Sequence, residues 1–164
     1  MPSYFPIFIN MEQKKCHVFG AGNIALRRIR TLLRYKAQVK VTALFICEEV
    51  RELQKDYPKQ LHIEQRAYCM GELQGVETDF VLAATDNREV NACISLECRQ
   101  NQIPVSNASD GSQCTFYFPA VAQLDNLVIG ITSLDGNHRD VAAFRKKLCQ
   151  QYQEERSAER NGTD

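Results

Sequence analysis

The segment "CHVFGAGNIALRR" has the residue types and spacing of a phosphate-binding turn. Gly20, Gly22 and Ala25 form a G-x-G-x-x-A pattern between an apolar run and a segment with helical apolar spacing. The first glycine permits a tight turn, the second lets backbone approach a pyrophosphate, and the small third residue allows close packing of helix on strand. The N–H groups of Asn23 and Ile24 would then face the anion. The pattern predicts a dinucleotide site, although an ordinary strand-to-helix turn has the same form.

The adenosine end of such a ligand lacks its usual partner. A dinucleotide site normally has an Asp or Glu at the end of the second strand, where it binds the ribose hydroxyls. Here the strand ends "VTALFICEE", and Glu48 and Glu49 come a few residues too late. Either the backbone around Leu44 and Phe45 holds the ribose, or the dinucleotide interpretation fails. No Arg follows the strand to bind a 2′-phosphate, which favours NAD over NADP.

Two further loops place polar groups where open α/β sheets bind ligands. Each of the segments "VLAATDN" and "VSNASD" is typical of a buried strand followed by such a loop. Thr85 and Asp86 can line the cofactor cleft, and Asp86 or Asn87 can cap the next helix. Asp110 can accept a proton in a dehydrogenation. An Asp before a glycine such as Gly111 is also common in turns without any function.

The elements that must position these loops alternate between strands and helices. Strands are expected over residues 16–20, 38–45, 61–68, 79–85 and 103–109, and helices over residues 23–35, 48–57 and 87–101. The first residues, "YFPIFIN", are expected to form a short strand or an extended arm. This alternation predicts an α/β fold, a Rossmann-like parallel sheet with helices on both faces.

The chain changes character after residue 112. An aromatic, hairpin-like stretch precedes a charged helix, so we expect an NAD-binding Rossmann-like domain over 1–112, a small α+β dimerisation segment over 113–157 and a flexible tail over 158–164. The segment is too short to hold a core of its own. Its apolar face needs another surface, either a partner subunit or the first domain. The residues of that face are Phe116, Phe118, Val128, Ile129 and Ile131.

Composition excludes several classes of protein. The chain has 164 residues with 20 Lys+Arg and 20 Asp+Glu, so net charge does not favour nucleic-acid binding. No long uncharged apolar run predicts a membrane span, and the first residues do not resemble a signal peptide, so a cytoplasmic protein is expected. The seven cysteines are scattered without C-x-x-C, which predicts reduced thiols and no metal site.

Several segments together resemble one family. They are "YFPIFIN", "VFGAGNIALRRIRTLL", "VLAATDNREVN", "VSNASD", "FYFPA" and "LVIGITSLDGNH". Their order and spacing resemble the precorrin-2 dehydrogenase / sirohydrochlorin ferrochelatase family, the dehydrogenase part of siroheme synthases, over nearly the whole chain. The resemblance implies an NAD-binding Rossmann domain and a following segment that forms an intertwined homodimer. It also implies oxidation of precorrin-2 to sirohydrochlorin with formation of NADH and, in some members, insertion of ferrous iron.

The resemblance implies roles for individual residues. Asp110, in "SNASD", matches the key functional Asp of the family. The family holds the ribose end largely by backbone, which fits the loop at Leu44 and Phe45. Ser133 matches a family serine near the substrate.

The loop "SLDGNHRD" departs from the family pattern, because His138 and Arg139 stand where smaller residues are common. His138 could ligate iron or move a proton, or it could be a solvated side chain. The substrate carries many carboxylates, so Arg139, Arg27 and Arg28 are candidates to bind it, with a solvated charged face as the alternative. Two other functions remain open at this point, a non-catalytic NAD-sensing dimeric module and a chelatase without dehydrogenase activity.

Overall fold

The protein, seen here as a computed structural model, is described over residues 4–161. It consists of two compact units: a larger one over Ile9–Tyr117, and a smaller one formed by the residues up to Phe8 together with the chain from Phe118 on. The sequence-based boundary at residue 112 thus lies a few residues before the boundary in the structure. The first residues, expected in the Rossmann-like domain, group with the later segment and contain no strand.

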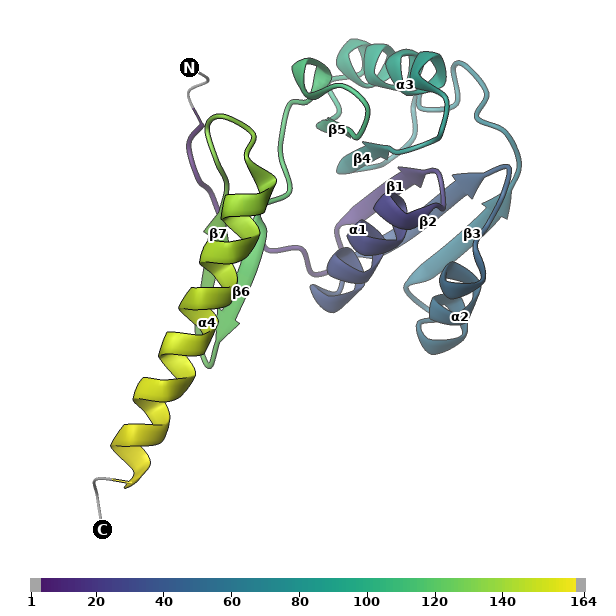
Figure 1. Cartoon of the computed structure of the whole chain (residues 1–164). Helices are drawn as coiled ribbons and strands as arrows, with labels where there is room; N and C mark the ends of the chain where they lie inside the picture. Colours follow the sequence, from purple (N-terminus) through teal and green to yellow (C-terminus); the bar gives the residue numbers. More distant parts are fainter. Residues whose placement is uncertain (1–3, 162–164) are drawn as a thin grey trace. The chain divides into compact units, whose positions relative to one another are not determined.

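The larger unit is built on a parallel sheet with the strand order β3-β2-β1-β4-β5, which confirms the predicted fold class (Figure 1). The order reverses beside β1, and in such sheets ligands bind at this switch point, beyond the carboxyl ends of the strands. The strands are β1 (Lys15–Phe19), β2 (Gln38–Ala43), β3 (Leu61–Gln65), β4 (Phe80–Ala83) and β5 (Val105–Asn107), and the helices are α1 (Asn23–Arg34), α2 (Glu48–Asp56) and α3 (Arg88–Gln100).

The helices cover both faces of this sheet. Helices α1 and α2 lie on one face and α3 on the other (Figure 1). Right-handed crossovers require this, because the chain steps from β1 to β3 in one direction and from β4 to β5 in the other. The core on the α3 side is formed by Phe19, Leu73, Val81, Ala83, Ile94, Cys98, Ile103 and Val105.

Helix α3 buries polar side chains as well as apolar ones. Ile94 is fully buried, as its spacing predicts, but Asn91 and Ser95 are equally buried. Val90 and Cys93, which the apolar spacing also places inward, are only half-buried. Since buried polar groups need hydrogen-bond partners, this face of α3 must meet polar groups of the loops around it.

The smaller unit is a β-hairpin against a long helix. Strands β6 (Ala120–Leu124) and β7 (Leu127–Ile131) pair antiparallel, and α4 (His138–Asn161) packs on β6. Asp125 in the hairpin turn accepts a hydrogen bond from the Tyr152 hydroxyl at 2.8 Å and lies 3.3 Å from Nε of Arg156. Helix α4 continues through residues 158–161, the first part of the predicted tail, and residues 162–164 lie outside the described chain.

The apolar face predicted for the dimerisation segment is divided in the structure. Phe116 belongs to the larger unit, where its ring packs edge-on against Phe80 at 5.3 Å between centroids. Val128 remains exposed, and Ile129 and Ile131 are half-buried.

None of the helices in the described chain is long and apolar enough to cross a membrane.

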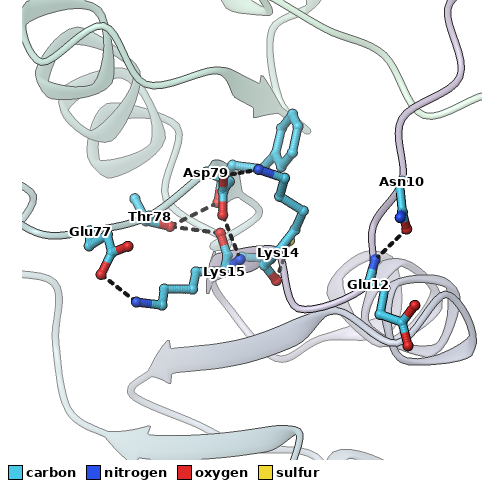
Figure 2. A network of polar contacts seen from close by, with 9 residues as sticks. Asn10, Glu12, Lys14, Lys15, Glu77, Thr78 and Asp79 are labelled. Carbon is cyan, nitrogen blue, oxygen red and sulfur yellow. Dashed lines mark hydrogen bonds and ion pairs between the residues drawn. The ribbon is translucent and has the colours of Figure 1, made fainter.

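Ion pairs close the amino edge of the sheet, opposite the predicted ligand site (Figure 2). Asp79 accepts hydrogen bonds from the Lys14 ammonium and from the Lys15 backbone N–H, both at 2.8 Å. The bond from Lys14, more than any other contact, holds the pKa of Asp79 below its usual value. Since Asp79 directly precedes β4, these bonds fix the start of β4 beside the start of β1.

His17 is buried in the sheet in its neutral form. Its Nε2 lies 2.8 Å from the Thr42 hydroxyl, and its ring stacks on Phe19 at 4.1 Å. Burial, assisted by the nearby Lys40 charge, lowers the pKa of His17 to about 4. A protonated imidazole is therefore disfavoured in the folded protein.

We expect His17 to make stability depend on pH. Its pKa is lower in the folded chain than the 6.5 of an unperturbed imidazole, so the unfolded chain binds more protons between these values. The stabilisation is present above about pH 6.5 and is lost as the pH falls toward about 4, by up to roughly 3 kcal/mol. Urea denaturation of wild type and of His17→Gln across this range measures it.

The exposed His62 on β3 provides the control. His62→Gln is expected to keep the wild-type pH dependence, whereas His17→Gln flattens it. An equal loss of stability in all three proteins at acid pH would contradict the assignment to His17.

Candidate active site at the carboxyl edge of the sheet

Gly20 directly follows β1, and a neighbouring loop leaves no room for a side chain at this position. Its φ is +106°, and a Cβ at this position would lie 2.1 Å from the carbonyl oxygen of Ala84. The loop after β4 therefore approaches the turn too closely for any side chain. The sequence predicts the tight turn, and the structure adds this contact as a second reason for glycine.

Gly22 is glycine for a different reason. Its backbone is extended, and a Cβ built on it would meet no atom of the described chain within 4 Å. The first bond of the α1 ladder runs from the Leu26 N–H to the Gly22 carbonyl at 2.8 Å, which leaves the preceding N–H groups, including those of Asn23 and Ile24, outside the ladder. Open space beside free N–H groups at a helix start fits an anion such as a pyrophosphate.

The loop after β2 offers backbone and apolar side chains. Leu44 and Phe45 are 59% and 83% exposed. The Leu44 carbonyl accepts a hydrogen bond from the Gln65 amide at 3.1 Å, and Nη2 of Arg51 donates to Gln65 Oε1 at 2.7 Å. The backbone of this loop is thus held in place from β3. The structure thus places the Arg51 guanidinium near the loop after β2, although no Arg directly follows that strand in the sequence.

The loop after β4 is held by a buried amide. Asn91 is fully buried, and its Oδ1 accepts the Thr85 N–H at 3.0 Å while its Nδ2 donates to the Thr85 carbonyl at 3.0 Å. The Thr85 hydroxyl also turns toward Asn91, at 2.7 Å from its Oδ1. Asn87 caps α3 by accepting the N–H groups of Glu89 and Val90, while Asp86 is exposed.

The loop after β5 carries Asp110, whose carboxylate accepts several hydrogen bonds. Oδ1 accepts the Ser112 N–H at 2.9 Å and the Ser112 hydroxyl at 2.7 Å, and Oδ2 accepts the Gln113 amide at 3.1 Å. The bonds from Ser112, with the Arg88 charge among the smaller contributions, hold the pKa of Asp110 below its usual value. The carboxylate is therefore ionised at neutral pH, which makes it a fixed charge and a weak base.

The parallel sheet brings most predicted site residues to one edge. The loops after β1, β2, β4 and β5 carry the predicted cofactor residues and Asp110, and the carboxyl ends of parallel strands share an edge. On α1, Arg27 is exposed and Arg28 half-buried. No cluster of three or more His, Cys, Asp or Glu that could hold a metal is found among residues 4–161.

The remaining predicted residues belong to the smaller unit. Ser133 is half-buried between β7 and α4, and His138 and Arg139 are exposed in the first turn of α4. Asn137 caps this helix by accepting the backbone N–H of Arg139 at 3.2 Å. These residues therefore lie outside the unit that carries Asp110.

Sequence reasoning missed the amides that organise the edge. Asn91, Asn107 and Gln113 bind one another's loops, but the sequence analysis gave none of them a role. The available signal was a polar residue where periodicity predicts an apolar one. Asn91 and Ser95 lie one turn apart on the face of α3 that also carries the fully buried Ile94.

Residues 7–120 match the model of a protein family described as "Putative NAD(P)-binding". The chain belongs to this NAD(P)-binding family. The match covers the glycine turn and all four loops of the carboxyl edge, which supports a dinucleotide as the ligand of this site.

Several curated proteins that are similar to this chain carry names that refer to siroheme synthesis. The "Probable multifunctional siroheme biosynthesis protein HemA" of Ruminiclostridium josui is 35% identical over 146 residues, or 88% of this chain. A siroheme synthase of Nitrosomonas europaea is 33% identical over 130 residues, or 79% of this chain. In both cases the match spans only 27% of the relative's length. These matches confirm the resemblance seen in the sequence.

A solved structure, "SirC, precorrin-2 dehydrogenase", shares the fold. It aligns with a TM-score of 0.74 over 91% of this chain and 71% of its own, at 23% sequence identity. At this identity the likeness establishes the architecture, including the parallel sheet followed by a hairpin and a helix.

The two glycines are expected to respond differently to substitution. Gly22→Val should fold normally and bind NAD at least about tenfold more weakly, because its side chain would fill the space beside the free N–H groups. Gly20→Ala should lose about 2 kcal/mol or more of stability, because it strains a positive φ and meets Ala84. Thermal unfolding and calorimetric NAD titration measure the two effects. Unchanged NAD affinity in a folded Gly22→Val protein would place the ligand elsewhere.

Proposed function

We propose that this chain oxidises precorrin-2 to sirohydrochlorin with NAD as the hydride acceptor. The observation that carries the proposal is the ionised Asp110 on the loop after β5, at the same sheet edge as the glycine turn. A module that only senses NAD has no need of a carboxylate held in this way. The names of the curated relatives support the tetrapyrrole as substrate.

The residues present fit the cofactor. The open space at Gly22 and the N–H groups of Asn23 and Ile24 would hold the pyrophosphate. The held backbone of Leu44, with Phe45 beside it, would take the adenosine end, as the family resemblance implies. Thr85 and Asp86 follow the neighbouring strand β4 and remain our candidates for the rest of the cleft. NAD, when bound, accepts a hydride.

Charge balance suggests what Asp110 does. Removing a hydride from precorrin-2 leaves a positive charge on the macrocycle, and loss of a proton to solvent water then restores neutrality. A fixed carboxylate stabilises the developing positive charge without taking up the proton itself. The lowered pKa of Asp110 favours this electrostatic role over that of a general base.

The direct test is anaerobic incubation of the protein with precorrin-2 and NAD. We expect NADH and sirohydrochlorin to appear in equal amounts. A parallel reaction with NADP tests whether Arg51, near the loop after β2, allows a 2′-phosphate to bind. Binding of NAD without turnover would support the regulatory module instead. Ferrochelatase activity, a cytoplasmic location and substrate contacts by Ser133, His138, Arg139, Arg27 and Arg28 stay predictions.

Replacing Asp110 should remove the reaction but not cofactor binding. We expect Asp110→Asn to lower kcat by about 10²–10³-fold, the range for a lost electrostatic group, with NAD affinity unchanged. The wild-type rate should show no limb from this carboxylate near neutral pH, because its pKa lies below the usual value. Steady-state kinetics against pH measure both. Asp56→Asn, exposed at the end of α2, is the matched control. Normal turnover by Asp110→Asn would refute the role.

We also propose that the chain forms a homodimer through residues 114–157. The smaller unit exposes many large apolar side chains for its size, between 40% and 84% of each. Such a surface is expected to be covered by another subunit. Leu127, Val128, Leu134 and Phe144 lie within residues 114–157, and Tyr4, Phe5, Ile7 and Phe8 come from the first residues of the same unit.

A charge on this surface should weaken the dimer. Phe144 on α4 is 58% exposed, and Phe144→Glu would place a charge in the proposed interface. We expect sedimentation at micromolar concentration to show a dimer for wild type and a larger monomer fraction for Phe144→Glu. Met70→Glu, on the exposed surface of the larger unit, should remain dimeric. A monomeric wild-type protein would rule out the interface.

A further inference from the structure

Asn107, at the end of β5, has an amide whose orientation is dictated by backbone. Its Oδ1 accepts the N–H of Ser109 at 2.9 Å and the N–H of Asp110 at 3.2 Å. Backbone N–H groups can only donate, so the side-chain oxygen must face them. The Nδ2 group of Asn107 is thereby turned in the other direction.

This orientation is passed on to Gln113. Asn107 Nδ2 donates to Gln113 Oε1 at 3.1 Å, and Gln113 Nε2 donates to Asp110 Oδ2 at 3.1 Å. Rotating the Gln113 amide by half a turn would set its NH₂ against that of Asn107 and its oxygen against a carboxylate. Both new contacts are repulsive, so the amide hydrogen of Gln113 stays aimed at Asp110.

Asn107 cannot relax away from this arrangement. Its side chain is buried, and its Nδ2 also donates to the Ser95 hydroxyl at 3.0 Å. The Ser109 hydroxyl bridges the two buried amides, because it accepts from Asn91 Nδ2 at 3.1 Å and donates to Asn107 Oδ1 at 2.8 Å. A buried network in which each member is bonded is rigid.

The two oxygens of Asp110 are held from different sides. Ser112 binds Oδ1 alone, so with Ser112 as its only partner the carboxylate could still pivot about that oxygen. Gln113 binds Oδ2 and removes this freedom. Other ionisable groups near the loop are Arg88, which lowers the pKa of Asp110, Cys114, whose thiol lies 3.8 Å from the Asp110 carbonyl, and Tyr117, whose hydroxyl donates to the Gly111 carbonyl at 2.6 Å.

We propose that Gln113 is a positioning residue, through which the buried Asn107 holds the Asp110 carboxylate in the one orientation that the reaction uses. The inference rests on the function proposed above for Asp110 and deepens it. Gln113 itself need not touch the substrate. Its contribution is to fix the plane of a charge that must face the developing positive charge of the macrocycle.

Gln113→Met tests the proposal, since methionine has a similar length but can neither accept from Asn107 nor donate to Asp110. We expect kcat with precorrin-2 to fall about tenfold, as for one lost hydrogen bond to a charged group, with NAD affinity unchanged. Gln100→Met, at the exposed end of α3, is the matched control. Should Gln113→Met not fold, Gln113→Leu carries the same test, because it is also uncharged and also lacks the acceptor for Asn107 and the donor to Asp110.

A double-mutant cycle separates positioning from general stability. If Gln113 acts through Asp110, adding Gln113→Met to Asp110→Asn should change kcat by less than about twofold. A further tenfold loss in that background would show that Gln113 acts independently of Asp110 and would overturn the proposal. An unchanged kcat in the single variant would overturn it as well.

A readout without turnover keeps this inference distinct from the proposed function. Carboxyl-carbon NMR of the resting protein should show the pKa of Asp110 rising slightly in Gln113→Met, since the bonds from Ser112 contribute more to lowering it, and unchanged in Gln100→Met. If this shift appears while wild type does not oxidise precorrin-2, the proposed function fails and the positioning stands. If wild type is active and the Asp110 pKa does not respond, the positioning fails alone.

Discussion

Backbone groups that leave the end of a parallel sheet must find new hydrogen-bond partners, and here buried amide side chains supply them. Thr85 has just left β4, and the Asn91 amide pairs with both its N–H and its carbonyl, as a neighbouring strand would. Asn107 does the same for the N–H groups of Ser109 and Asp110 after β5. Because both amides are buried, they do not occupy the exposed side of the loops.

The same solution explains why one face of α3 is polar. Asn91 holds the loop after β4 from the start of the helix. Near its other end, Glu97 accepts the Leu73 N–H at 2.7 Å and binds the Tyr68 hydroxyl, which fixes the long connection from β3 to β4. No helix forms in that connection. Helix α3 thus stabilises two irregular segments through side chains buried at well-separated positions. Because these hydrogen bonds are buried, removing one partner would leave the other polar group unpaired, which is costly.

The glycine turn combines two different demands in one short motif. Packing within the protein requires glycine at position 20, since the Ala84 carbonyl leaves no room for a side chain there. At Gly22, by contrast, no atom of the described chain lies within 4 Å of a Cβ built there, and the ligand is our proposed reason for the glycine. Open space at this glycine, beside N–H groups that the helix ladder does not use, is the feature on which our proposed placement of the dinucleotide rests.

The sequence by itself determined the alternating strands and helices of the larger unit, the glycine turn and the family resemblance. Apolar periodicity and short motifs are local properties, and β1 to β5 with their helices lie close to the expected ranges because hydrophobic burial follows that periodicity. Only the tertiary structure decided the partners of Asn91, Asn107 and Gln113 and the approach of Arg51 to Gln65. Hydrogen bonds between separate segments leave no periodic trace in the sequence, because periodicity shows only which positions are buried.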